Sequence, residues 1–197
     1  MSLLKLVNLD CPSCGSAMTG EGFDTIFFCS HCGAAAVLDE EGLQTVEGSA
    51  LMAAPGRRAD TWRPAWRLEV DVRVAKRFRS DGRETPGWEG RRVFFVPAFD
   101  LPLGDASRLA RALSDTTEAR AEVPREPIHG GTLAHDDAMV LVRHLLVGDE
   151  VRRSDMLASV EVAVDQVGRS LAAIPFERHD DRLRCAVTGV VVRTEGH

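Results

Sequence analysis

The feature that most constrains this chain is a pair of Cys-x-x-Cys-Gly motifs near its start. Cys11 and Cys14 lie in CPSCG, and Cys29 and Cys32 lie in CSHCG, with fourteen residues between the two pairs. Four thiolates in two tight turns can surround one tetrahedral ion, and a glycine after each pair accepts the left-handed backbone that such turns need. The pattern predicts one metal site with these four cysteines as ligands and Zn²⁺ as the metal.

The residues around the motifs predict a short β-hairpin ribbon. TIFF at 25–28 reads as a strand, and AAAVLDEEGLQTV reads as a strand, a turn at 39–42 and a second strand. Residues 9 to about 47 resemble the zinc-ribbon class. The resemblance implies a single structural Zn²⁺ clamping the hairpin.

Three alternatives to zinc remain open at this point. A rubredoxin-like iron site uses the same CxxCG pairs, two disulfides would form in an oxidising compartment, and the cysteines could be free thiols. Four cysteine ligands leave no open coordination position, so catalysis at the metal is not expected. His31, inside the second motif, is expected to be exposed, and Cys185 is expected to be a buried core thiol.

Charge is distributed unevenly along the chain. Residues 1–50 hold one lysine and seven acids, whereas residues 57–92 hold eleven basic and six acidic residues. A ribbon this acidic disfavours direct contact with nucleic acid, since phosphate binding relies on Lys and Arg. The basic stretch 57–92 keeps nucleic-acid binding open as an alternative, with Trp62, Trp66 and Trp88 available to stack on bases. A tryptophan pair such as Trp62 and Trp66 at a strand entry is, however, more typical of a core plug.

The body of the chain alternates strand and helix signals. Leu68, Val70, Val72 and Val74 alternate with charged residues, which predicts a half-buried strand at 67–74. The remaining expected elements are a strand at 93–96, helices at 103–119 and 135–150 with Gly148 closing the second, and separate strands at 159–167, 170–176, 182–187 and 189–194, with a hairpin turn at 179–181. The predicted organisation is a zinc ribbon at 1–47, a linker at 48–60 and an α+β domain at 61–197. That domain is expected to hold a mainly antiparallel sheet and about two helices.

Motifs in the body add a second resemblance. The WRPAW entry into a strand, the VPAF strand end and the late IPF strand are similar to a group of uncharacterised bacterial zinc-ribbon-containing proteins. This resemblance implies a bacterial origin and a two-part architecture, and it implies no activity.

The sequence contains no recognisable catalytic set. Neither a phosphate-binding glycine loop nor a GxSxG elbow occurs. The best cluster is His129, His135, Asp136, Asp137 and His144, but residues 135 and 144 lie on opposite sides of a helix, so capping by the two aspartates is the simpler interpretation. His179, Asp180 and Asp181 are interpreted as turn residues.

These observations favour a non-catalytic protein. We expect a zinc-binding structural or adaptor protein that engages protein partners or assembles with itself within a larger bacterial assembly. A nucleic-acid-binding protein and a rubredoxin-like electron carrier are the alternatives. No stretch is long and apolar enough to span a membrane, and paired cysteines used for metal fit a reducing compartment, so we expect a cytoplasmic location.

Overall fold

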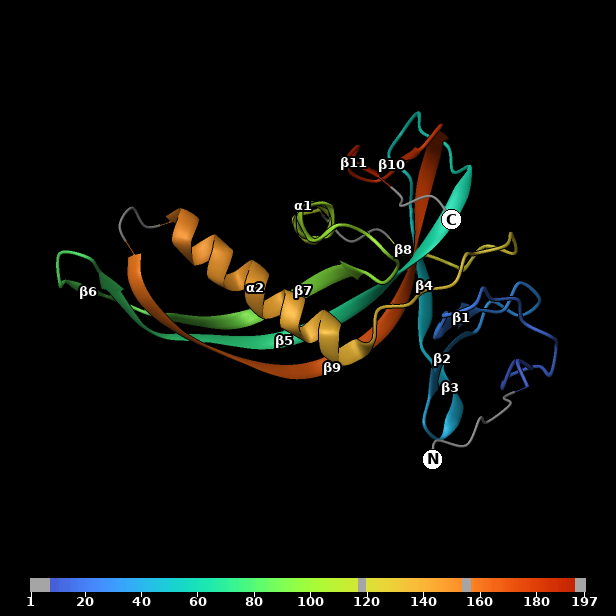
Figure 1. Cartoon of the computed structure of the whole chain (residues 1–197), viewed down its shortest axis with the longest axis horizontal. Helices are drawn as coiled ribbons and strands as arrows, with labels where there is room; N and C mark the ends of the chain where they lie inside the picture. The colour runs from blue at the N-terminus through green and yellow to red at the C-terminus, as the bar shows by residue number, and fades with distance from the viewer. Residues whose placement is uncertain (1–7, 117–119, 154–156, 194–197) are drawn as a thin grey trace.

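The computed structural model describes residues 8–116, 120–153 and 157–193. A three-stranded sheet near the N-terminus is joined to a larger, curled, mostly antiparallel sheet that carries two helices within the described residues (Figure 1). The predicted α+β fold class is confirmed. None of the helices in these ranges is long and apolar enough to cross a membrane.

The small sheet contains strands β1 (Ile26–Phe28), β2 (Ala35–Asp39) and β3 (Gly42–Val46), all antiparallel. Asp39 makes the β2–β3 turn, because its Oδ1 accepts hydrogen bonds from the backbone N–H groups of Glu41 at 2.9 Å and Gly42 at 3.1 Å. These strands and this turn lie where the sequence predicts them.

Three long strands build an arm that extends away from the small sheet (Figure 1). β5 (Thr61–Arg79) lies between β7 (Trp88–Pro97) and β9 (Leu157–His179) and pairs antiparallel with both, while the short β6 (Glu84–Thr85) pairs with the far end of β5. The apolar residues predicted for 67–74 all point inward and are buried: Leu68, Val70, Val72 and Val74.

β9 is one strand where the sequence predicts two. Its register against β5 shifts after Glu69, which pairs with Gly168 while Val70 pairs with Gln166. The extra residue, Val167, forms a β-bulge that bends the strand without ending it. The turn-like GRS at 168–170 therefore lies inside a continuous ladder.

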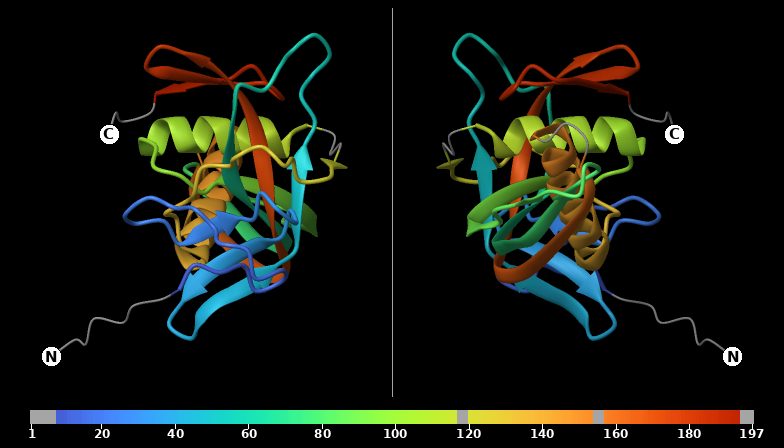
Figure 2. Two further views of the ribbon diagram at one scale, coloured as in Figure 1. Left: turned by 90° about the vertical axis from the view of Figure 1, so that its right-hand side faces the viewer. Right: turned by 90° about the vertical axis from the view of Figure 1, so that its left-hand side faces the viewer.

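The other end of the large sheet gathers short strands around β9. β4 (Gly48–Leu51) runs parallel to β9 and pairs with β8 (Arg120–Ala121), while β10 (Arg182–Cys185) joins β9 to β11 (Val191–Arg193). The segment 48–60, predicted to be a linker, thus begins with a strand of the large sheet. The end views place the β10–β11 hairpin and the small sheet on opposite sides of the molecule (Figure 2).

The two helices cover the large sheet. α1 (Leu103–Ser114) packs on β7, and α2 (His135–Arg153) runs along the arm (Figure 1). α2 continues through Gly148, where the sequence predicts its end. A Cβ at Gly148 would lie 3.2 Å from Nη2 of Arg111, whose Nε pairs with Asp149 at 2.9 Å. The glycine therefore leaves room for an arginine that ties α1 to α2.

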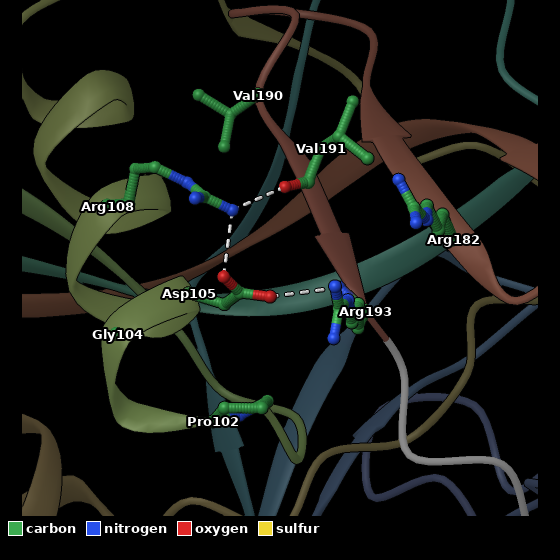
Figure 3. Close-up of a pocket in the computed structure, with 8 residues that line it drawn as sticks. All are labelled: Pro102, Gly104, Asp105, Arg108, Arg182, Val190, Val191 and Arg193. Atoms are coloured by element: carbon green, nitrogen blue, oxygen red, sulfur yellow. Dashed lines mark hydrogen bonds and ion pairs between the residues drawn. The ribbon is translucent and has the colours of Figure 1, made fainter.

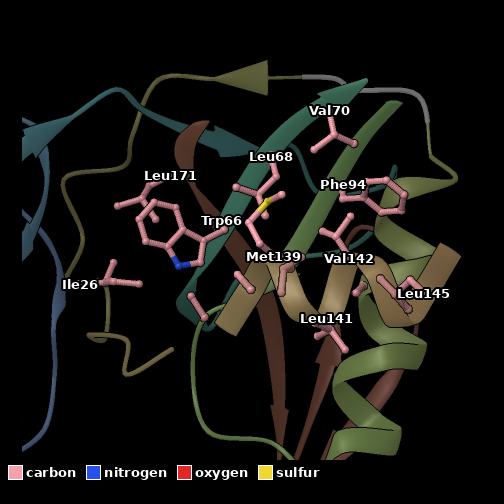
Figure 4. Close-up of a cluster of buried hydrophobic side chains, with 14 of the residues drawn as sticks. Ile26, Trp66, Leu68, Val70, Phe94, Met139, Leu141, Val142, Leu145 and Leu171 are labelled. Carbon is pink, nitrogen blue, oxygen red and sulfur yellow. The ribbon is translucent and has the colours of Figure 1, made fainter. Parts of the chain in front are cut away.

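The main core lies between α2 and the arm strands (Figure 4). Trp66 is fully buried there, and its indole Nε1 donates a hydrogen bond of 2.9 Å to the carbonyl of Leu133. Ile26, from the small sheet, belongs to the same cluster. The predicted core role of Trp66 is confirmed.

Candidate metal centre

The two cysteine motifs form matching turns. In the first, the backbone N–H of Gly15 donates to the carbonyl of Cys11 at 2.8 Å, and Cys11 donates to Ser16 at 2.8 Å. In the second, Gly33 donates to Cys29 at 2.7 Å, and Cys29 donates to Ala34 at 2.8 Å. The glycines take φ angles of +72° and +79°, the left-handed region that the sequence analysis expects of them.

The turns bring the four sulfur atoms into one cluster. Sγ of Cys11 lies 3.6 Å from Sγ of Cys32, and Sγ of Cys14 lies 3.6 Å from Sγ of Cys29. All four sulfurs lie within 4.8 Å of one another. Tetrahedral bonds of about 2.3 Å would place thiolates roughly 3.8 Å apart, so the cluster is positioned to bind one metal ion. No disulfide joins any two of the five cysteines, which differs from the two-disulfide alternative.

The four cysteines of the cluster differ in exposure and in pKa. Cys11 and Cys29 are buried, Cys32 is half-buried and Cys14 is exposed. Hydrogen bonds from Ser16 lower the pKa of Cys14 to about 6. The backbone N–H of Ala34 lowers the pKa of Cys32, but burial and the neighbouring thiols outweigh it and raise this pKa to about 12. Ionising all of these thiols together would bring several negative charges close to one another, which is unfavourable. A divalent cation bound among them would neutralise that repulsion and favour the thiolate form.

A third turn of the same kind occurs in the body. The N–H of Gly189 donates to the carbonyl of Cys185 at 2.8 Å, Cys185 donates to Val190 at 2.8 Å, and Gly189 has φ +79°. Thr188 stands where a second cysteine would be, and Cys185 is fully buried, as predicted. CAVTG at 185–189 keeps the first cysteine and the final glycine of the two motifs, and this shared spacing is a signal that the sequence offers for the third turn.

The ribbon packs tightly against the body. Strand β1 exchanges backbone hydrogen bonds with Gly131: the N–H of Ile26 donates to its carbonyl at 3.0 Å, and Gly131 donates back at 3.1 Å. A Cβ at Gly131 would lie 2.5 Å from the carbonyl oxygen of Ala98, so only glycine fits at this seam. Phe27 faces the cysteine cluster, while Ile26 and Phe28 join the main core. The cysteine cluster is therefore coupled to the body through β1.

The other predicted candidates do not converge on a second site. Among the described residues, the four cysteines are the one group positioned to hold a metal. His135 Nδ1 lies 3.0 Å from Asp136, and its ring meets Trp66 edge-on, whereas His144 is exposed farther along α2. His129 lines a small cavity with Glu21 and Asp24 of the ribbon. His179 and its two aspartates lie at the predicted β9–β10 turn, and His31 is exposed as predicted.

The sequence analysis missed an arginine-rich cavity of about 650 Å³ beside α1 (Figure 3). Asp105 accepts a hydrogen bond from Arg108 at 2.8 Å and another from the backbone N–H of Arg193 at 3.0 Å. Arg108 also donates to the carbonyl of Val191 at 2.6 Å. These bonds fasten α1 to the β10–β11 hairpin. These residues come from segments far apart in the sequence, so no local sequence pattern predicts that they meet.

Comparisons of the chain with protein families, with curated proteins and with solved structures give no match.

Proposed function

We propose that the cysteine cluster holds one structural Zn²⁺ and that the chain is a non-catalytic adaptor in a bacterial cytoplasmic assembly. The observation that carries the proposal is the set of four thiols within 4.8 Å, which packs on Phe27 of the same strand whose Ile26 and Phe28 join the body core. Four cysteine ligands complete a tetrahedral shell. The ion would then stabilise the ribbon and present no open position to a substrate.

The small size of the ribbon supports a folding role for the metal. Its own core is a minor cluster built around Phe27 and Met18 together with two of the cysteines. A hairpin of this size gains too little from burial to fold alone, and small domains commonly rely on a metal instead. Zinc suits the site because it accepts four thiolates and has no redox chemistry. Reduced thiols support a cytoplasmic location, and the bacterial origin rests on the resemblance seen in the sequence.

Ion pairing in the basic stretch weighs against nucleic-acid binding. Arg91 pairs with Asp71 at 3.0 Å and Glu69 at 3.5 Å, and Arg77 pairs with Glu150 at 2.7 Å. Of the three tryptophans, Trp66 is fully buried and cannot stack on a base without breaking the core. Charges satisfied within the protein contribute little to phosphate binding.

The exposure of Cys14 favours the electron-carrier alternative as a second candidate function. Cys14 is exposed, so a metal at this site would lie near the surface, where electron exchange is efficient. An iron–thiolate centre would colour the protein, whereas a zinc centre is colourless. Absorption and metal content therefore separate the two candidates directly.

The metal test is elemental analysis of natively purified protein from cells supplied with both zinc and iron. We expect one zinc per chain and no visible absorption. One iron per chain with a thiolate absorption band would overturn the zinc assignment in favour of electron transfer. Cys11→Ser should lose the ion and Cys185→Ala should keep it, since Cys185 belongs to a separate buried cluster.

The adaptor test begins with affinity purification at native expression levels, followed by reconstitution of the complex from two purified components. We expect a stoichiometric complex formed by the wild-type protein and by Cys185→Ala. Turnover of a substrate by the purified chain, or the absence of any complex in both steps, would overturn the adaptor role while leaving the zinc assignment standing.

A further inference from the structure

The outer face of α2 carries an apolar stripe that no described residue covers. Val140, Val147 and Val151 are 59%, 41% and 56% exposed, although the opposite face of the helix is buried against the arm. The buried residues of that inner face are Ala138, Met139, Leu141, Val142, Leu145, Leu146 and Glu150. A helix that is apolar on both faces is typical of one that is covered on both faces.

The stripe has the spacing of a helix-packing seam. Val140, His144, Val147 and Val151 follow one another at intervals of four, three and four residues. At 100° per residue these positions fall within about 60° of one another, in a line about 16 Å long. Side chains spaced alternately three and four residues apart lie on one side of a helix, where they can pack between the side chains of a second helix.

Exposed apolar side chains concentrate here. Leu103, 64% exposed, lines the same groove as Val140, at the junction of α1 and α2. The other large exposed apolar residues, Phe23, Met52 and Val167, lie singly on other segments. A group of exposed apolar residues on one surface is typical of an interaction site, whereas exposed apolar residues that lie singly need no explanation.

The charges on the helix are complementary to a second, antiparallel copy of it. Asp136 and Asp137 lie in its first turn, and Arg152 and Arg153 lie in its last turn. Asp137 and Arg152 lie on the same side of the stripe, about 20° and 80° around the helix from its nearest edge. Within the chain Arg152 also pairs with Asp149 at 3.3 Å. Two copies of α2 packed antiparallel would bring Asp137 of each beside Arg152 of the other, twice by symmetry. A parallel arrangement would set like charges together.

We propose that the chain forms a two-fold symmetric dimer through antiparallel packing of its α2 helices. In the best register Val140 faces Val151 of the second copy and His144 faces Val147, with the two-fold axis between residues 145 and 146. A two-fold interface buries the same patch on both copies, so one stripe is sufficient. A single helix pair with flanking contacts from Leu103 is a small interface, so the dissociation constant is expected in the micromolar range. The inference depends neither on the metal nor on the adaptor role.

The test is sedimentation equilibrium of the full-length, metal-loaded chain across a dilution series. We expect a monomer–dimer equilibrium. Val147→Glu should weaken dimerisation by at least about thirtyfold, because it buries a carboxylate near the axis. The matched control, Val167→Glu, changes a valine of similar exposure (46%) on β9 and should leave the equilibrium unchanged.

A charge swap tests the antiparallel arrangement. Asp137→Arg and Arg152→Asp should each weaken the dimer about tenfold, since each sets like charges together twice. The double variant, with the charges exchanged, should recover to within about threefold of the wild type. Thermal unfolding of every variant verifies that the fold is intact.

Three outcomes would overturn the proposal. A wild-type chain that stays monomeric throughout the series has no such dimer, and a different protein bound at the stripe would then be its occupant. A dimer that Val147→Glu leaves intact uses another surface. A double variant that is as weak as the single variants excludes antiparallel pairing of these charges.

Discussion

The carboxylate of Glu150 lies 2.7 Å from Nε of Arg77, and the Glu150 side chain is only 1% exposed. The glutamate comes from α2 and the arginine from β5, so the ion pair fastens the helix to the arm. Glu150 also accepts a hydrogen bond of 2.9 Å from the indole Nε1 of Trp88 and pairs with Arg153 at 3.3 Å. Guanidinium groups of Arg92 and Arg153 lie over the Trp88 ring, at 4.8 and 5.6 Å from its centroid. A buried carboxylate is tolerated here because several donors surround it.

Removing this carboxylate should be costly. Glu150→Ala leaves Arg77 in a half-buried site without its partner and Trp88 without an acceptor, so we expect a loss of about 3–5 kcal/mol in the free energy of unfolding. Urea denaturation measures it. Glu150→Gln is the matched control: it keeps an acceptor for Trp88 and should lose less. A cost below about 1 kcal/mol for the alanine variant would contradict this account of the buried pair.

Metal removal should destabilise the body as well as the ribbon. Cys29→Ser removes a buried ligand, and because Ile26 and Phe28 carry the ribbon into the main core, the loss should lower the melting temperature of the whole chain. Strong chelation of the wild type should have the same effect. We expect calorimetry to show one cooperative transition and a decrease of several kcal/mol in the free energy of unfolding. A body transition unchanged by chelation would show that the ribbon and the body unfold independently.

The left-handed glycines offer a test of the three matching turns. Gly33→Ala and Gly189→Ala both place a Cβ at φ +79°, which should cost about 1–2 kcal/mol each. Gly33→Ala should also weaken metal binding, since it distorts the turn that holds Cys29 and Cys32. Gly189→Ala should leave the metal content unchanged. Gly104→Ala, in open space within the first turn of α1, is the control and should be neutral or slightly stabilising.

His129 should make stability dependent on pH. Burial lowers its pKa, and the positive charge of Arg63 lowers it further. The unfolded chain, with an ordinary histidine pKa of about 6.5, therefore takes up this proton before the native state does as the pH falls. The stability that neutral His129 contributes is fully present above that pH and is lost as the pH falls below it, by at most about 1.4 kcal/mol per pH unit.

The measurement for His129 is the free energy of unfolding between pH 7.5 and 5.5 at matched metal content. His129→Gln should flatten the pH dependence relative to the wild type. His179→Gln, in the exposed β9–β10 turn, is the control and should keep the wild-type slope. Equal slopes for all three proteins would exclude His129 as the responsible group.

How far the sequence predicts the structure depends on how local each signal is. The ribbon follows from contiguous residues, since the cysteine turns, the Asp39 turn and the flanking strands are each defined within a few positions. The alternation at 67–74 is equally local. By contrast, the sequence alone predicts a helix end at Gly148, because Arg111, which accounts for the glycine, lies far away in sequence. The sequence does not predict the bulge at Val167 either, since only the pairing with β5 shows that the strand continues.

The long central strand sets a distance within the molecule. β5 contains nineteen residues in one strand, and each adds about 3.3 Å, so its path from Thr61 to the tip at Arg79 is roughly 60 Å long. Its pairing with β9 runs along nearly the whole of that path, and α2 braces it through Glu150. The ribbon seam lies against Pro64 of this strand, so fifteen residues of unbroken backbone, roughly 50 Å, separate the seam from the tip at Arg79.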